Sequence, residues 1–251
     1  MTITLVTGTG TGIGKTVVTA ALVARALAAG KSVAAVKPVQ TGVSPGEPAD
    51  VDEIGRLSGC SSLHELQRLP DPLAPETAAR ISGVRLASCS ELARSVLDIA
   101  RDHDEVFAEG SGGLLVRLDN AGGTLLDLAD ALSIGAEVRF VVVTTLDLGT
   151  LNHTELTVNA LRVRGFEPAG LLIGRRPPDP LRLAERSNLV DLPRLTGVPI
   201  LGAIPDGATN LTPAELAAAF ADPTLILRDP TLIPRDPTLN LRDPTLASRD
   251  L

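Results

Sequence analysis

The sequence predicts a doubly wound α/β fold with a mainly parallel sheet. Short runs rich in β-branched residues alternate with longer segments rich in alanine and leucine, which is the pattern of strands joined by crossover helices. Several of the short runs are apolar throughout, as is typical of strands covered on both faces. The 251 residues, of which 44% are hydrophobic, are enough for one sizeable core.

The alternation places each element in turn. We expect strands at residues 2–7, 32–36, 105–108, 138–144, 169–173 and 199–204. Helices are expected at residues 15–29, 51–57, 90–101, 125–132 and 152–164. Gly30, Gly135 and Gly165 follow three of these helices, where a left-handed glycine often ends a helix. Residues 44–87 are richer in proline and polar residues, and such an excursion between two strands often carries substrate contacts.

The C-terminal segment differs from the rest. From Asp222 the tetrapeptide Asp-Pro-Thr-Leu recurs with a period of seven. A heptad can indicate a coiled coil, but the proline of each repeat removes a backbone donor and clashes with the preceding turn. The few apolar residues of each repeat cannot offset the entropy lost on ordering. We therefore expect a folded domain over residues 1–221 and a disordered tail over residues 222–251, the alternative being a tail that docks on its own domain or on a partner.

Composition excludes several classes of protein. With 23 basic and 30 acidic residues the formal net charge is −7, which argues against a nucleic-acid partner. The two cysteines, Cys60 and Cys89, lack metal-binding or disulfide-scaffold spacing, so both are expected to be inert in a reducing compartment. The N-terminus has no basic region typical of a signal peptide, and no apolar stretch reaches the ~20 residues of a membrane helix. We expect a cytoplasmic protein with no membrane partner.

The strongest motif is the segment Gly8–Thr16, GTGTGIGKT, where the first strand gives way to the first helix. Such a loop turns backbone N–H groups and a helix N-terminus toward an anion, with Lys15 on the outer phosphates and the Thr16 hydroxyl on Mg²⁺. The loop is one residue longer than the common phosphate-loop spacing. A dinucleotide fingerprint fails because its third glycine would fall on Ile13 or Lys15, and no acidic residue ends the second strand.

A phosphate loop needs a second magnesium-holding group, usually a carboxylate at the end of a neighbouring strand. Glu109 and Asp147 both end predicted strands. The glycine-rich turn at residues 110–113 lets backbone approach a ligand closely and favours Glu109, although either acid could be an ordinary residue at the rim of the sheet.

A lysine stands at the carboxyl end of the second strand, the rim where ligands bind in open α/β sheets. This residue, Lys37, is followed by Pro38 in the segment KPVQTG and can present a fixed positive charge to an anion, with Thr41 adding a neutral hydrogen bond. We expect its ammonium group to face a γ-phosphate held near Lys15, rather than to be solvated.

Four motifs, in order, resemble dethiobiotin synthetase of the biotin pathway: GTGTGIGKT at 8–16, KPVQTG at 37–42, EGSGG at 109–113 and LGTLNH at 148–153. The likeness spans residues 1 to about 207, and the longer phosphate loop is similar to the family's own. It implies a P-loop NTPase fold, a homodimer and a ligase that uses ATP and Mg²⁺ to form dethiobiotin from 7,8-diaminononanoate and CO₂. In the implied reaction a carbamate is phosphorylated to a carbamic-phosphoric anhydride, and the second amine closes the ring.

The resemblance also implies residue roles. Lys37 and Thr41 would bind the carbamate and Lys15 the phosphates, and these three are the implied catalytic residues. The implied magnesium ligands are Thr16, Asp50 and Glu109, with Asp52 a rival to Asp50. The expected nucleotide contacts are Gly12, Ile13, Gly14, Lys15, Thr16, Val17, Asp50, Glu109, Gly110, Ser111, Gly112, Gly174, Arg175, Ile204, Pro205 and Asp206. The expected substrate contacts are Lys37, Thr41, Gly113, Leu151 and Asn152.

Two further expectations concern the substrate carboxylate and the nucleotide base. Asn152 begins a helix whose N-terminus would cap the substrate carboxylate across a dimer interface, whereas His153 is expected to be packed rather than catalytic. Some relatives carry an Asn-Asp pair that reads adenine where this chain has residues 174–178, GRRPP. ATP is therefore the first expectation and CTP or another triphosphate the alternative.

Three other functions fit parts of the pattern. A regulatory ATPase of the chromosome-partitioning or septum-placing kind would carry an extra lysine in the loop, and residues 9–13 contain none. An amide-forming enzyme acting on corrin acids would need a glutaminase domain with a nucleophilic cysteine, for which neither cysteine has the context. A nucleotide-binding module without catalysis would leave Lys37 without a task.

Overall fold

The main sheet is formed by parallel strands. The computed structural model describes residues 1–221, and the expected tail lies outside the described residues. The strands of the main sheet are β1 (Thr2–Gly8), β2 (Val33–Lys37), β4 (Leu63–Glu65), β6 (Glu105–Glu109), β7 (Glu137–Thr144), β8 (Pro168–Arg176) and β9 (Ile200–Pro205). Their order across the sheet is β4-β2-β6-β1-β7-β8-β9, and every pairing is parallel. The predicted doubly wound α/β class is confirmed.

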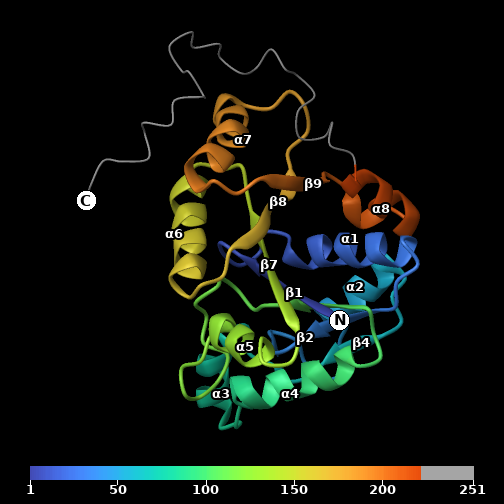
Figure 1. Cartoon of the computed structure of the whole chain (residues 1–251), viewed down its shortest axis with the longest axis vertical. Coiled ribbons are helices and arrows are strands. Elements are labelled where there is room, and N and C mark those ends of the chain that lie inside the picture. The colour runs from blue at the N-terminus through green and yellow to red at the C-terminus, as the bar shows by residue number, and fades with distance from the viewer. Residues whose placement is uncertain (222–251) are drawn as a thin grey trace.

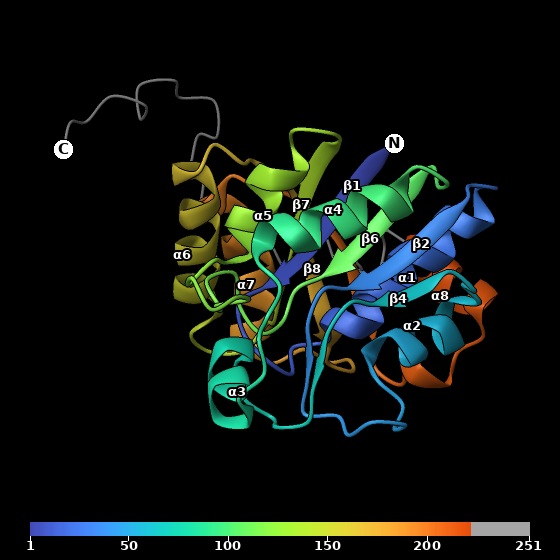
Figure 2. The same ribbon diagram turned by 90° about the horizontal axis from the view of Figure 1, so that it is seen from below.

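Helices cover both faces of this sheet (Figure 1). They are α1 (Lys15–Ala28), α2 (Asp50–Ser58), α3 (Pro75–Ser82), α4 (Cys89–Ala100), α5 (Leu125–Leu132), α6 (Thr150–Val163), α7 (Leu183–Thr196) and α8 (Pro213–Ala221). Helices α1, α2 and α8 lie together on one face, and α4 and α5 lie on the other (Figure 2). Among the described helices, none combines the length and the hydropathy needed to cross a bilayer.

The two-sided cover explains the uninterrupted apolar runs. Successive strand side chains point to opposite faces, and in β2 residues Ala34 and Val36 belong to one core cluster while Val33 and Ala35 belong to the other. Strand β7 alternates in the same way. Because both faces are buried, most positions of such a strand are apolar, and the expectation of strands covered on both faces is confirmed.

The excursion at residues 44–87 holds more structure than the sequence predicted. Strand β4 adds to the edge of the main sheet beside β2, and a two-residue strand, β3 (Gln40–Thr41), pairs with β5 (Arg68–Leu69). Helix α3 follows, and α7 and α8 were also unpredicted. The short strands have only two or three residues, too few for a period of two to be recognised in the sequence.

Two of the three expected glycine caps are confirmed. Gly30 and Gly165 have φ of +79° and +81°, in the left-handed region. Gly135 does not: α5 ends at Leu132, and its C-cap residue, Ser133, has a right-handed conformation. A Cβ on Gly135 would lie 3.2 Å from the side chain of Leu97 in α4. The glycine therefore leaves room for α4 to pack closely and does not cap α5.

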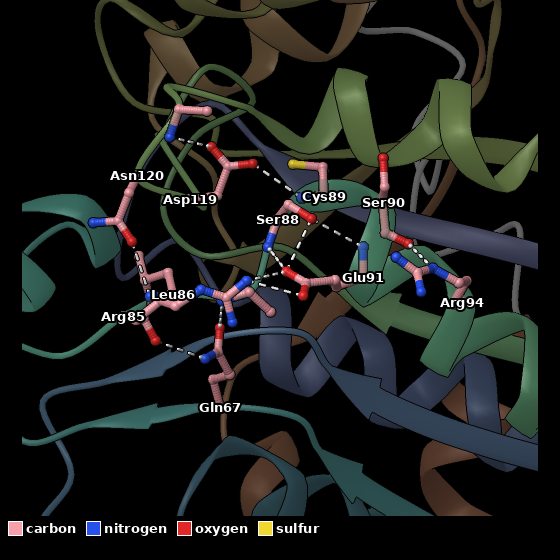
Figure 3. Close-up of polar contacts among 12 residues, drawn as sticks. Gln67, Arg85, Leu86, Ser88, Cys89, Ser90, Glu91, Arg94, Asp119 and Asn120 are labelled. Carbon is pink, nitrogen blue, oxygen red and sulfur yellow. Dashed lines mark hydrogen bonds and ion pairs between the residues drawn. The ribbon is translucent and has the colours of Figure 1, made fainter.

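A hydrogen-bond network at the start of α4 fixes the long loop between β6 and α5 (Figure 3). Asp119 in that loop accepts from the backbone N–H of Cys89 at 2.9 Å, and Asn120 accepts from that of Leu86 at 2.9 Å. Ser88 and Glu91 form a capping box on the same helix. The loop that begins directly after Glu109 is therefore anchored at its far end. Cys89 is buried within the network, and burial raises its thiol pKa to about 12, as expected of an inert cysteine.

Candidate functional site

The loop between β1 and α1 is shaped to receive an anion. Gly12 and Gly14 have φ of +73° and +93°, a conformation that glycine adopts without strain. Within residues 1–221, the backbone N–H groups of residues 10–17 have no protein acceptor. Lys15 begins α1, and its ammonium group donates to the carbonyl of Gly10 at 2.7 Å. The loop therefore gathers free donors and one cation around a helix N-terminus, which is an arrangement that binds phosphate.

The end of β8 holds this loop in place. A Cβ on Gly174 would lie 1.7 Å from the carbonyl oxygen of Ile13, and one on Gly14 would lie 2.4 Å from the carbonyl oxygen of Gly174. Real side chains never come so close to backbone, so both positions require glycine if the loop and strand are to touch.

We predict that Gly174→Ala weakens nucleotide binding by about tenfold to a hundredfold, because a forced shift of the loop costs about 1–3 kcal/mol. Titration calorimetry with ATP measures the change, and thermal unfolding of the same variant checks that it is folded. Unchanged affinity in a folded variant would show that the contact between loop and strand does not support the binding geometry.

Lys37, at the end of β2, lies between two carboxylates. Its Nζ is 2.7 Å from Oε1 of Glu109 and 2.6 Å from Oδ2 of Asp50. Oε1 of Glu109 also accepts from the hydroxyl of Thr16 at 3.2 Å. Lys37 and Glu109 are almost fully buried. Side chains from α1, β2, α2 and β6 thus meet in one polar cluster. The cluster contains all three predicted metal ligands.

Burial and neighbouring charges shift the pKa values of the two lysines in opposite directions. Burial disfavours the charged form of Lys37, but the charges of Glu109 and Asp50 outweigh it and raise the pKa of Lys37. Burial lowers the pKa of Lys15 to about 8, and the attraction of Glu109 only partly opposes it. Lys37 is therefore a fixed cation in direct contact with both acids, whereas Lys15 forms no ion pair among the described residues and is repelled by the charge of Lys37.

The geometry separates the rival acids. Asp50 faces Lys37, whereas Asp52 accepts from the backbone N–H of Ala49 at 2.7 Å and caps α2. Glu109 lies against Thr16, whereas Asp147 is exposed on the loop after β7. Asp50 and Glu109 therefore belong to the cluster around Lys37, whereas Asp147 lines the open pocket beside Gly12 and Gly14.

A pocket of about 870 Å³ opens beside the loop, between the ends of β8 and β9. Nine of the predicted nucleotide contacts line it: Gly12, Ile13, Gly14, Val17, Gly174, Arg175, Ile204, Pro205 and Asp206. Arg175 and Asp206 form an ion pair at 2.9 Å on its wall. Its size is in the range of sites for small molecules.

Comparison with known proteins identifies the family. The family model described as "AAA domain" matches residues 3–213. The ATP-dependent dethiobiotin synthetase of Rhodococcus jostii is 53% identical over 219 residues, which cover 87% of this chain and 93% of that protein. The chain belongs to the dethiobiotin synthetase family. The family's enzyme from Streptomyces coelicolor is 50% identical, over 87% of this chain and 90% of that protein.

Solved structures show the same fold at much lower identity. The cell division ATPase MinD of Pyrococcus furiosus aligns over 90% of this chain and 96% of its own with a TM-score of 0.53, at 19% identity. Likeness at that identity shows the fold alone. The chain is thus a dethiobiotin synthetase relative on a fold that a cell division ATPase also has, and the sequence rather than the fold shows its family.

In this dethiobiotin synthetase family member, the predicted residues of the glycine-rich turn follow Glu109 directly. The carbonyl of Gly110 is 3.5 Å from the Lys37 ammonium group. Ser111 donates to the carbonyl of Val39, and Gly112 is left-handed at φ +66°. Thr41 lies on β3, and among the described residues no hydrogen bond joins its hydroxyl to the cluster. Gly113 lines a second, smaller pocket of about 310 Å³ with Gly8, Thr9, Leu114, Leu115, Val116, Leu156, Thr157 and Ala160.

Among the described residues, no hydrogen bond or ion pair joins Leu151 or Asn152, at the start of α6, to the cluster around Lys37. Leu151 is half-buried, and Asn152 is exposed. Neither lines the two pockets described above. His153 is exposed rather than packed, because the buried face of α6 passes through Thr150, Thr154, Val158 and Leu161. The expectation for His153 was wrong for that reason.

Sequence reasoning missed two buried polar residues at the site. Thr19 in α1 lies 3.2 Å from Oε2 of Glu109. Gln40 accepts from the backbone N–H of Asp50 at 3.3 Å and donates to the carbonyl of Thr41 at 3.0 Å, so it joins two predicted site residues. The KPVQTG motif contained Gln40, but only the fold shows that its side chain reaches α2.

Proposed function

We propose that this chain uses ATP and Mg²⁺ to convert 7,8-diaminononanoate and CO₂ into dethiobiotin, through a carbamate and a carbamic-phosphoric anhydride. One observation carries the proposal: a buried lysine, Lys37, contacts Glu109, and the same carboxylate oxygen accepts from Thr16 at the end of the phosphate loop. A carbamate is an anion, and its attack on a γ-phosphate brings two anions together. A fixed cation at that point lowers the repulsion between them.

The nucleotide would lie with its phosphates on the loop and its base in the larger pocket. The free N–H groups of residues 10–17 and the Lys15 ammonium group support this orientation. Arg175 lies in the segment where some relatives have an Asn-Asp pair, and on the wall of the pocket it forms an ion pair with Asp206. We propose ATP as the nucleotide, with CTP or another triphosphate as the alternative that competition binding would test.

The residues present fit a magnesium ion. Mg²⁺ is bound in nucleotide enzymes by one or two carboxylates, a hydroxyl and phosphate oxygens rather than by an all-protein cage. Asp50 and Glu109 already converge on one cation, the Lys37 ammonium group, and Thr16 adds a hydroxyl oxygen to the same cluster. Within residues 1–221, no group of three His, Cys, Asp or Glu side chains could hold a metal ion without other ligands. Binding through two carboxylates, a hydroxyl and phosphate oxygens does not need such a group. When bound, Mg²⁺ would neutralise charge on the transferred phosphoryl group.

The protein side chains then have separate tasks. Lys37 would orient the carbamate oxygen toward the γ-phosphate, and Thr41 would hydrogen-bond beside it. Lys15 would exchange its bond to Gly10 for one to the phosphates as they enter the loop. Closure of the ring needs the second amine at the same carbon, so the substrate must be held at both ends.

We propose that a second copy of the chain completes the substrate site. The smaller pocket is apolar and suits the aliphatic part of the substrate, and it opens toward exposed Leu115 and Leu156. Leu148, just before α6, and Val163, its last residue, are also exposed. A homodimer through this face would bury them and bring Leu151 and Asn152 of one copy to the site of the other.

Leu156→Glu tests the dimer. A buried charge at the interface is expected to turn the dimer into a monomer in sedimentation velocity and to raise the KM for diaminononanoate. Leu183, an exposed leucine at the start of α7, provides the matched control Leu183→Glu. A monomeric wild-type protein with full activity would remove the proposal.

The function itself is tested by incubating the full chain with 7,8-diaminononanoate, bicarbonate, Mg²⁺ and ATP. Dethiobiotin should form in equal amount to phosphate, as mass spectrometry and a phosphate-release assay would show. Phosphate release that does not depend on the diamine, with no dethiobiotin, would contradict the ligase.

Two further expectations complete the proposal. We propose that residues 1–221 are the synthetase domain. We also propose that the protein works in the cytoplasm, since both of its cysteines are free and ATP is consumed there.

A further inference from the structure

Thr19 is a buried polar residue to which the reaction as described gives no task. It lies in α1 one turn after Thr16, on the same face of the helix. Its side chain is fully buried, and its hydroxyl lies 2.9 Å from the carbonyl oxygen of Lys15 and 3.2 Å from Oε2 of Glu109. Both neighbours are acceptors, so the single hydroxyl hydrogen is directed at one or shared between them.

The two oxygens of Glu109 have different partners. Oε1 accepts from Lys37 at 2.7 Å and from Thr16 at 3.2 Å. In the part of the chain that the structure describes, Thr19 is the one donor to Oε2. A carboxylate held at a single oxygen can still turn about its last side-chain bond, whereas one held at both oxygens cannot. Thr19 therefore limits the rotation of the group.

The helix itself does not require this hydroxyl. Threonine is a poor helix former, and a hydroxyl bonded to the carbonyl four residues earlier adds little to a helix. Thr196 in α7 is also buried and donates to the carbonyl of Leu192 at 2.7 Å, and within residues 1–221 no hydrogen bond joins it to a carboxylate. The contact with Glu109 is thus what distinguishes Thr19 from an ordinary buried threonine.

We propose that Thr19 is a positioning residue that orients the Glu109 carboxylate so that Oε1 faces Thr16 and Lys37. The inference rests on the proposed function, in which Glu109 helps to hold Mg²⁺. Residues that orient a metal ligand through a hydrogen bond alter metal affinity by about 10–100-fold when they are removed.

The test is the affinity of the full-length protein for Mn²⁺ in the presence of ADP, followed by electron paramagnetic resonance of free Mn²⁺. Thr19→Val should raise the Kd for Mn²⁺ at least about tenfold. Thr19→Ser keeps the hydroxyl and should stay within about twofold of wild type, and the matched control Thr196→Val should not change the Kd. The comparison of Thr19→Ala with Thr19→Ser isolates the hydroxyl in the same way if the valine variant does not fold.

Glu109→Gln separates this inference from the proposed function. If Glu109→Gln weakens Mn²⁺ binding while Thr19→Val and Thr19→Ala do not, the positioning role is overturned and the role of Glu109 stands. If Glu109→Gln also leaves Mn²⁺ binding unchanged, the metal site of the proposed function is wrong and the inference falls with it. Loss in Thr19→Val with recovery in Thr19→Ser supports the inference.

Discussion

Lys15→Ala is expected to reduce triphosphate turnover by about a hundredfold to a thousandfold, the effect of removing one charged donor from a site of phosphoryl transfer. Lys15 begins α1 at the left-handed Gly14, and its side chain is buried beside the loop. Its pKa of about 8 leaves it largely protonated at pH 7, and its ammonium group bonds to the loop carbonyl of Gly10. In the variant the loop would keep its free N–H groups but lose the cation that reaches the outer phosphates.

Phosphate release and dethiobiotin yield should fall together in Lys15→Ala. Lys31 offers a matched control, since it is exposed and paired with Glu105 away from the loop, and Lys31→Ala should retain full turnover. Turnover near the wild-type rate in Lys15→Ala would remove the phosphate-loop assignment on which the nucleotide site depends.

Elements could be predicted from the sequence where their buried residues are apolar, and they were missed where the buried residues are polar. All six predicted strands are present, because each is buried on both faces. Helix α7 was missed because its inward stripe is Glu185, Asn188, Leu192 and Thr196, three of which are polar. Asn188 is buried because its side chain donates to the carbonyl of Leu146 at 2.8 Å, a tertiary contact that hydrophobic periodicity does not reveal.

The candidate site was predictable to the extent that it stands at strand ends and in glycine turns. Lys37 and Glu109 are the last residues of β2 and β6, and parallel strands bring their carboxyl ends to one edge of the sheet. The choice between Asp50 and Asp52 was open in the sequence because both lie in the first turn of α2. It required the cap geometry, in which Asp52 bonds to Ala49.

Thr19 lay beyond sequence reasoning for a different reason. It occupies the interior of a helix, where a threonine has no distinguishing local pattern, and its partner Glu109 is 90 residues away. Polar residues that act through another side chain become visible only when the fold sets the two side by side.

Lys37→Ala is expected to abolish ring closure while leaving the nucleotide bound. Lys37 does not line the larger pocket, so the affinity for ATP with Mg²⁺ should stay within about threefold of wild type, less than the tenfold that corresponds to 1.4 kcal/mol. Dethiobiotin formation should fall by at least about a thousandfold, because the carbamate loses the cation that holds it against the γ-phosphate. Titration calorimetry and mass spectrometry measure the two quantities separately.

The same substitution should destabilise the free protein more than the protein with ligand bound. In the free protein it leaves Glu109, which is 1% exposed, without its cation, and breaking a buried pair of this kind costs about 3–5 kcal/mol. Magnesium and nucleotide should restore much of the loss, since Mg²⁺ would supply a replacement cation beside Asp50 and Glu109. A larger rise in Tm on adding Mg-ATP to Lys37→Ala than to wild type is therefore expected.

Lys37→Arg distinguishes charge from position. The guanidinium keeps the positive charge and should preserve the stability of the free protein better than alanine does, but its planar fork cannot occupy the place of a compact ammonium group between Asp50 and Glu109. Product formation should therefore remain low. If arginine restored dethiobiotin formation to near the wild-type rate, charge alone would suffice and Lys37 could not be the group that orients the carbamate. A near-normal yield of dethiobiotin in Lys37→Ala would show that not even a positive charge is needed at this position.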